Sequence, residues 1–409
     1  MKATTSQPGQ AYAEVEGKWV IHAGFLLLFP GFFLYQTLLG IGVIRAYLGG
    51  YFSVMAFALM PPLVWYYFVA TRKVRNYFFK TDLYFLLFAA YYAAVLATNF
   101  AVGTNHGLAQ KYVASLVFCV DVYIIFRMLD LSDRLFVAAA TTSLLLMSGI
   151  TLYFSIDGFF YLKNLDEASN PESLATYQGF ARSYIYTFLI VVSTIKTIGV
   201  RFLLYVLATV TLFVNGARSE FSAVLFVIPI IELYHAKNKL YSITMAFFLA
   251  IWVGANFDEI LRVLPDSRIL QLFDMSHSSS SAAREQLSLD AWRTILQNPI
   301  FGDFGSYADG HYAHNILCAW VDFGLIGFVY LAMLLAWPAV RMATNGFFAT
   351  AKSAEFVLAF AFSCIGILWA LTAKAVPDMS IGAALGAFAQ YRYRAKCDRS
   401  GVVSTDRLS

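Results

Sequence analysis

The sequence of 409 residues has little charge. Asp, Glu, Lys and Arg make up 13% of it, whereas 59% of the residues are hydrophobic and the mean hydropathy is +0.64. Soluble globular chains carry about 25% charged residues. The composition therefore excludes an ordinary soluble enzyme and indicates a polytopic membrane protein. The net charge of +4 is small and does not call for a nucleic acid or an acidic partner.

Cysteines and nucleotide-binding motifs are also scarce. Of the four cysteines, Cys119, Cys318 and Cys364 lie in apolar segments and Cys397 lies in the polar C-terminal tail, so no disulfide framework is expected in outer loops. The sequence has no P-loop and no dinucleotide fingerprint. A nucleotide-driven mechanism and a nucleotide-sugar donor are therefore disfavoured. The lack of an internal repeat weakens a transporter interpretation.

Long apolar runs recur along the whole chain. A bilayer core of about 30 Å needs roughly 20 apolar residues to cross it as a helix. We predict twelve crossings, at residues 19–43, 48–70, 83–103, 112–128, 135–156, 183–198, 201–215, 219–235, 240–256, 314–340, 354–373 and 376–391. The break between the sixth and seventh runs is only a few residues long.

The distribution of basic residues predicts the orientation. With both termini in the cytoplasm, 19 of the 29 Lys and Arg residues fall on the inner side, as the positive-inside rule requires. The predicted parts are listed in chain order: an inner tail at 1–18, nine transmembrane helices within 19–256 that include an outer loop at 157–182, a large outer loop at 257–313, three helices within 314–391 and an inner tail at 392–409. The first run is interpreted as an uncleaved anchor.

The large outer loop contains one predicted helix. Leu287, Ala291 and Ile295 recur at helical spacing, with Trp292 beside them, and the "NP" pair at 298–299 ends the pattern. An amphipathic helix with a tryptophan is suited to the membrane interface. The glycine-rich stretch "FGDFGSYADG" then leads back to the bilayer.

Three acidic residues lie inside predicted crossings, where an unpaired charge is costly. Glu232 is near an inner end, so snorkelling or Lys237 is expected to relieve it. Asp121 is deeper and is expected to pair with a neighbouring helix. Asp322 is the third, in the tenth run.

The polar residues of the outer side converge by topology. Arg218 lies in the turn "NGARSEF", Arg284 at the start of the loop helix, and His311 and His314 before the tenth run. Guanidinium groups bind phosphate oxygens bidentately, and imidazole can accept a proton from a hydroxyl. This set suits a lipid-linked diphosphate donor whose sugar is attacked by an acceptor hydroxyl. An arginine in such a turn can equally be a snorkelling anchor.

Two other chemistries have weaker signals. Asp309, His311 and His314 could supply metal ligands, but His-x-x-His at a helix start is a common chance pattern, and the proposed transfer needs no metal. A Ser-His-Asp hydrolase is disfavoured because no nucleophile elbow occurs.

The stretch "SAAREQLSLDAWRTILQNPIFGDFGSY...HYAHNILCAWVDFGLIGF" resembles the signature of the O-antigen ligase and polymerase superfamily of bacterial envelopes. The resemblance covers residues 282–328, with weaker support from "NGARSEFSAVLF" at 215–226. It implies an all-α membrane glycosyltransferase resembling the GT-C class, without cofactor or metal. The implied location is the bacterial inner membrane, with the active site on the periplasmic face.

The resemblance also implies roles for individual residues. Arg218 and Arg284 match the arginines that bind the donor diphosphate, and His314 matches the histidine that acts as base or positions the acceptor. Asn315 matches the motif in a structural role, as do Gly324 and Gly327. The remaining candidates are His311 and Arg293, which have weaker support, Tyr307 as a packing or sugar contact, and Trp292 as an interface anchor.

The expected reaction joins undecaprenyl-diphosphate-linked repeat units into a polysaccharide in lipopolysaccharide biosynthesis. Expected partners are this donor, a glycan or lipid A core acceptor, membrane lipids and a chain-length regulator protein. Three alternatives stay open: an O-antigen ligase or protein O-oligosaccharyltransferase, a transporter of a lipid-linked solute that depends on Asp121 and Asp322, and a structural membrane subunit.

Overall fold

The computed structural model describes residues 18–45, 51–74, 76–103, 106–162, 176–256, 259, 279–307, 311–349, 351–372 and 378–399. These residues are almost entirely helical. The elements are α2 (Lys18–Leu26), η1 (Leu27–Gly31), α3 (Phe32–Gly40), α4 (Tyr51–Lys73), α5 (Lys80–Val102), α6 (His106–Met128), α7 (Arg134–Tyr153), β1 (Ser155–Ile156), β2 (Phe159–Phe160), α9 (Thr176–Thr194), α10 (Ile198–Asn215), α11 (Arg218–His235), α12 (Lys239–Ala255), α14 (Ser279–Gln297), α15 (Leu317–Asn345), α16 (Ala354–Thr372) and α17 (Met379–Arg399).

Eight helices in the described ranges are long and apolar enough to cross a membrane. They are Lys18–Gly40, which joins α2, η1 and α3, together with α4, α5, α6 from Gly107, α7, α10, α15 and α16. The prediction of an all-α membrane protein is therefore confirmed. Helices α9, α11, α12 and α17 coincide with the other four predicted runs. The count of twelve crossings and their sidedness stay predictions.

Several boundaries differ from the predicted ones. Helix α9 begins at Thr176, so the end of the predicted 157–182 loop is helical. A short hairpin of β1 and β2 spans the start of that loop, because Asp157 and Gly158 adopt the left-handed backbone that a tight turn needs. Helix α17 continues to Arg399, well into the predicted inner tail.

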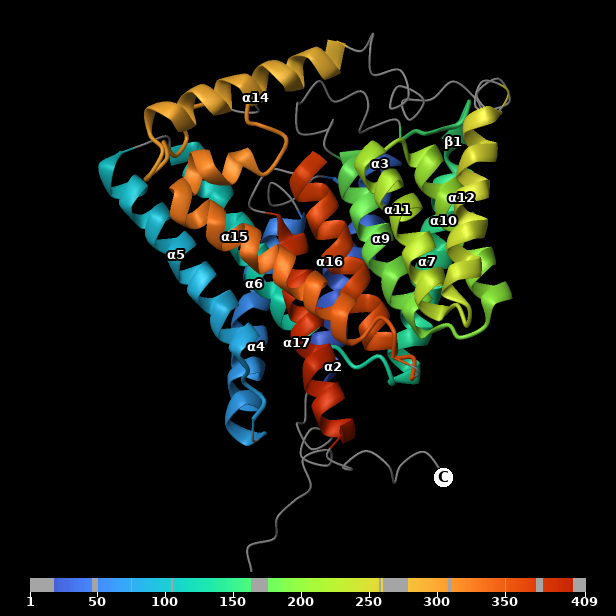
Figure 1. Ribbon diagram of the computed structural model, residues 1–409. Helices are drawn as coiled ribbons and strands as arrows, with labels where there is room; N and C mark the ends of the chain where they lie inside the picture. The colour runs from blue at the N-terminus through green and yellow to red at the C-terminus, as the bar shows by residue number, and fades with distance from the viewer. Residues whose placement is uncertain are drawn as a thin grey trace, which may run out of the picture.

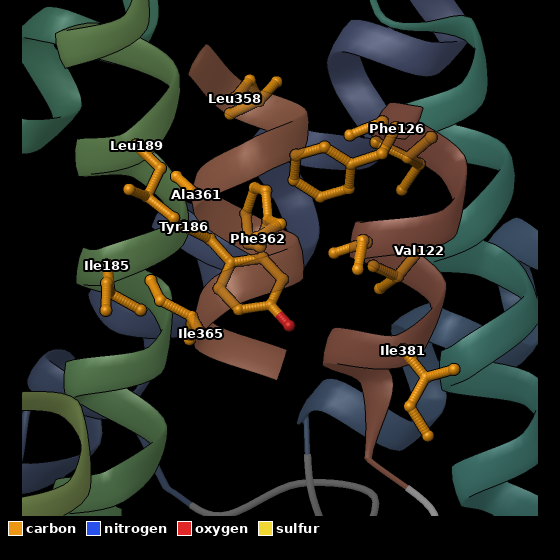
Figure 2. Packing of buried hydrophobic residues seen from close by; sticks show 14 of the residues in the cluster. Val122, Phe126, Ile185, Tyr186, Leu189, Leu358, Ala361, Phe362, Ile365 and Ile381 are labelled. Atoms are coloured by element: carbon orange, nitrogen blue, oxygen red, sulfur yellow. The ribbon is translucent and has the colours of Figure 1, made fainter. Parts of the chain in front are cut away.

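Aromatic packing fills the core between α6, α9 and α16 (Figure 2). Phe126 and Tyr186 both contact Phe362, with ring centroids 4.7 and 4.9 Å apart respectively. Helix α17 lies directly against α6, since a Cβ added at Gly382 would lie 2.2 Å from the carbonyl oxygen of Cys119. Even an alanine at position 382 would therefore clash with the backbone of α6.

Two acidic residues inside the helices, Asp82 and Glu232, are each paired with an arginine. Arg127 donates to Asp82 at 2.8 Å, and neither side chain is exposed. Glu232 accepts from Arg201 Nε at 2.6 Å and from Tyr205. The partner of Glu232 is therefore Arg201 on α10, which makes two hydrogen bonds to it, and not the predicted Lys237.

Helix α14 crosses one end of the bundle, opposite the last described turn of α17 (Figure 1). Ala291 and Ile295 are buried against the start of α15, as their spacing predicted, and Leu287 is half-buried. Trp292 remains partly exposed beside Trp320.

The loop after α14 is inserted into a break in α15. The predicted continuous helix across "DFGLIG" is wrong, because Gly324 has φ 67° and ψ −176°. The loop docks there through two backbone hydrogen bonds, from Asp303 N to Val321 O at 2.7 Å and from Leu325 N to Ile300 O at 3.0 Å. A Cβ at Gly324 would lie 2.2 Å from the oxygen of Ile300, so only glycine fits.

Candidate functional site

The candidate site lies at the end of the bundle that α14 crosses. The His314 ring is tilted against Tyr312 with centroids 4.7 Å apart, and Tyr312 in turn contacts Tyr307 edge to face at 6.3 Å. All three residues precede α15. The histidine singled out by sequence is thus held in an aromatic row rather than on a free loop.

A short chain of hydrogen bonds ties His314 to the helix that carries Arg284. Asn315 Oδ1 accepts from the Leu317 amide at 3.0 Å, and Asn315 Nδ2 donates to Ser288 Oγ at 3.2 Å. Ser288 Oγ donates to the carbonyl of Arg284 at 2.9 Å. Asn315 therefore links α14 to the start of α15.

Tyr312 lies within electrostatic range of two arginines. Burial, followed by the Cys318 thiol and then Asp378, raises the pKa of Tyr312, whereas the positive charges of Arg182 and Arg284 act in the opposite direction. Tyr312 is consequently a neutral hydroxyl at neutral pH. The structure thus brings Arg284 and His314 to one place and adds Arg182, which sequence did not single out.

Arg182 is the most enclosed cation of this region. Its Nη2 lies 2.9 Å from Asp378 Oδ2, and the two side chains are 18% and 10% exposed. Asp378 Oδ1 accepts from the amide of Ser380 at the start of α17. The pair connects α9 to α17 across the bundle.

Two hydrogen-bond donors at this ion pair have no acceptor in the described residues. Within the described ranges, Arg182 Nε and the Tyr186 hydroxyl are buried and have no hydrogen-bond partner. Tyr186 is one turn from Arg182 on α9 and interacts electrostatically with Asp378 and Glu220. Buried donors without acceptors are costly, so this corner is suited to an anionic oxygen.

Arg218 is the first residue of α11 and is partly exposed. The backbone beside it is held near Arg182, because Trp369 Nε1 donates to Ser219 O at 3.0 Å and its ring lies 5.8 Å from the Arg182 guanidinium. Glu220, two residues after Arg218, is fully buried and interacts electrostatically with Arg182.

Tyr307 belongs to a buried cluster under the aromatic row. Its hydroxyl donates to both carboxylate oxygens of Asp322 at 2.9 Å, and Tyr112 and Cys318 also donate to that carboxylate. Burial and then the charge of Asp322 raise the pKa of Tyr307. Of its two expected roles, the geometry favours packing over sugar contact.

Two predicted candidates, Arg293 and His311, are exposed. Arg293 is on the exposed face of α14 and pairs with Asp290 at 2.8 Å, with both side chains more than half exposed. His311 is exposed and precedes the row. Asp309, the third residue of the metal alternative, lies outside the described residues. Among those that are described, no group of three or more His, Cys, Asp or Glu side chains could hold a metal ion.

Sequence reasoning missed Arg182, Tyr186 and Asp378. A basic residue at a loop end looks like an ordinary anchor, and its acidic partner is far away in the chain. The assembled group has three cations at one end of the bundle, unfilled buried donors, a neutral tyrosine hydroxyl and an imidazole. It can bind an anion and hold a hydroxyl for deprotonation. The sequence matches no protein-family model and no curated protein.

Proposed function

We propose that the protein is a membrane glycosyltransferase that takes a glycan from a polyprenyl-diphosphate donor, of the undecaprenyl type in a bacterial inner membrane. The observation that carries the proposal is Tyr312, which contacts His314 and lies within electrostatic range of both Arg182 and Arg284. Tyr312 therefore lies near the candidate base, His314, and near two candidate phosphate ligands from different helices.

In this mechanism the arginines bind the diphosphate. Arg284 approaches from α14, and Arg182 offers its unfilled Nε beside the Tyr186 hydroxyl. Negative charge grows on the diphosphate as its bond to the sugar breaks, so fixed cations stabilise the transition state more than the bound donor. Arg218, at the start of α11, is the third proposed ligand.

His314 is proposed to accept the proton of the attacking hydroxyl. The oxygen then forms the new bond to the anomeric carbon, the old C–O bond breaks, and the electron pair leaves with the polyprenyl diphosphate. Contact with the tilted Tyr312 ring limits rotation of the imidazole, which keeps its nitrogen directed at the acceptor. No residue here needs a metal for this step.

We propose polymerisation of repeat units as the reaction, and transfer to lipid A core or to a protein hydroxyl as the alternative. The test is reconstitution of the pure protein with an undecaprenyl-diphosphate glycan, first alone and then with lipid A core. Longer lipid-linked chains from donor alone support a polymerase, and products formed only with core support a ligase. No product in either case contradicts the enzyme proposal.

One observation favours transport of a lipid-linked solute as a second candidate. Asp121 on α6 is fully buried, and neither of its carboxylate oxygens has a hydrogen-bond partner in the described residues. The expected pairing of Asp121 with a neighbouring helix is therefore wrong within those residues. Asp121→Asn distinguishes the candidates: a transporter that uses this carboxyl loses its activity, whereas glycosyl transfer at the outer cluster continues.

A further inference from the structure

Helices α12 and α16 begin at the end of the bundle opposite α14 (Figure 1), and two lysines lie close together at these helix starts. Lys239 is the first residue of α12, and Lys352 lies two residues before α16. Partial loss of hydration, and then the charge of Lys239 close beside it, lower the pKa of Lys352. Two like charges are thus held together where α11, α12, α15 and α16 meet.

Neither ammonium group forms an ion pair with a carboxylate in the described ranges. Lys239 Nζ donates to Leu233 O at 3.0 Å and Tyr234 O at 3.3 Å, and Lys352 Nζ donates to Ala349 O at 2.9 Å. Carbonyl oxygens solvate an ammonium group without neutralising it. The pair therefore keeps a positive charge that an anion would balance.

The nearby acidic side chains have other partners. Glu232 is bound by both Arg201 and Tyr205. Glu355 accepts from Ser353 Oγ at 2.9 Å. In the described ranges, neither carboxylate forms an ion pair with Lys239 or Lys352.

Two helix starts add to the positive potential. Asn238 caps α12 by accepting from the Tyr241 amide at 3.1 Å, and Ser353 caps α16 by accepting from the Phe356 amide at 3.2 Å. Each helix start contributes roughly half a positive charge. These partial charges lie at the same two helix starts as the ammonium groups of Lys239 and Lys352.

The surroundings of the pair are apolar and aromatic. Lys239 Nζ lies 5.0 Å from the Phe347 ring centroid, and Lys352 Nζ lies 4.2 Å from that of Tyr234. Beside them, Phe348 is 72% and Leu240 75% exposed. Exposed apolar side chains at the ends of long apolar helices belong at a bilayer surface, the depth at which lipid phosphates lie.

We propose that Lys239 and Lys352 form a binding site for the phosphate group of an anionic phospholipid. A free phosphate ion shares the charge but has no acyl chains to cover Phe348 and Leu240. The site lies at the end of the bundle opposite the proposed transfer site and does not depend on that function.

The test measures the thermal unfolding midpoint of the full-length protein in detergent with dioleoyl phosphatidylglycerol, dioleoyl phosphatidylcholine or inorganic phosphate. Phosphatidylglycerol should raise the midpoint of the wild type, and the rise should be lost in K239Q/K352Q. The rise should persist in K239R/K352R. It should also persist in K80Q/K196Q, which removes two other exposed lysines, one at the start of α5 and one between α9 and α10.

An equal rise in K239Q/K352Q overturns the site, and a full effect of phosphatidylcholine or inorganic phosphate overturns the lipid assignment. If the glutamine variant does not fold, the salt dependence of the wild type decides. The rise should shrink as NaCl screens the charges, and a rise that is independent of salt contradicts the proposal.

Discussion

The guanidinium of Arg182 and the carboxylate of Asp378 form an ion pair of 2.9 Å between α9 and the start of α17. This pair holds Arg182 in place while its Nε stays unfilled beside the Tyr186 hydroxyl. Removing either partner would leave a largely enclosed charge uncompensated. A substitution that keeps the charge is therefore the sharper test.

Arg182→Lys keeps the positive charge but loses the planar fork that binds phosphate oxygens in pairs. We expect kcat/KM for the lipid-linked donor to fall about 10- to 100-fold, equivalent to roughly 1.4–2.8 kcal/mol. Steady-state kinetics in proteoliposomes measure this. Arg293→Lys, on an exposed surface pair, is the control and should stay near wild type. Equal kinetics for Arg182→Lys and wild type would remove Arg182 from the donor site.

Arg284→Ala and Arg293→Ala compare two arginines of the same helix. Arg284 lies in electrostatic range of Tyr312, whereas Arg293 pairs with Asp290 on the exposed face. We expect Arg284→Ala to raise the KM for the donor about tenfold, because the variant loses the attraction between the guanidinium and the diphosphate. A tenfold change corresponds to roughly 1.4 kcal/mol of binding free energy. Arg293→Ala should leave KM unchanged. Equal effects of both would show that only general surface charge matters.

Gly324→Ala places a Cβ against the oxygen of Ile300 and forces a side chain onto a residue with φ 67°. The loop that follows α14 should detach from α15. We expect lower thermal stability and loss of turnover together, because that loop also carries Tyr307. Gly149→Ala in α7, where an added Cβ meets nothing within 4 Å, is the matched control and should be neutral or slightly stabilising. A fully active Gly324→Ala would refute the docking role.

Asp82→Ala leaves the buried guanidinium of Arg127 without its carboxylate. Breaking such a pair costs about 3–5 kcal/mol, whereas Asp290→Ala in the exposed pair should cost below about 1 kcal/mol. Unfolding in mixed detergent and denaturant micelles measures the difference. Similar costs for the two variants would mean that the Asp82–Arg127 pair does not support the fold.

The helical architecture was predictable because a backbone in lipid must satisfy its own hydrogen bonds, so long apolar runs become helices. The face of α14 was likewise predictable from the spacing of Ala291 and Ile295. The break at Gly324 was not, since it depends on docking of a loop that local pattern does not encode. The sequence did not point to Arg182 for a similar reason. Its ion-pair partner Asp378 is far away in the chain, and only the fold brings the two residues together.

The most direct test of the proposed transfer site is to follow release of polyprenyl diphosphate from the lipid-linked donor together with glycan product. We predict that the wild type releases one diphosphate for each new glycosidic bond. His314→Ala should bind the donor normally and release none, because the base next to Tyr312 is gone. Release by His314→Ala at the wild-type rate, or none by the wild type, would contradict the assignment of this cluster as a glycosyl-transfer site.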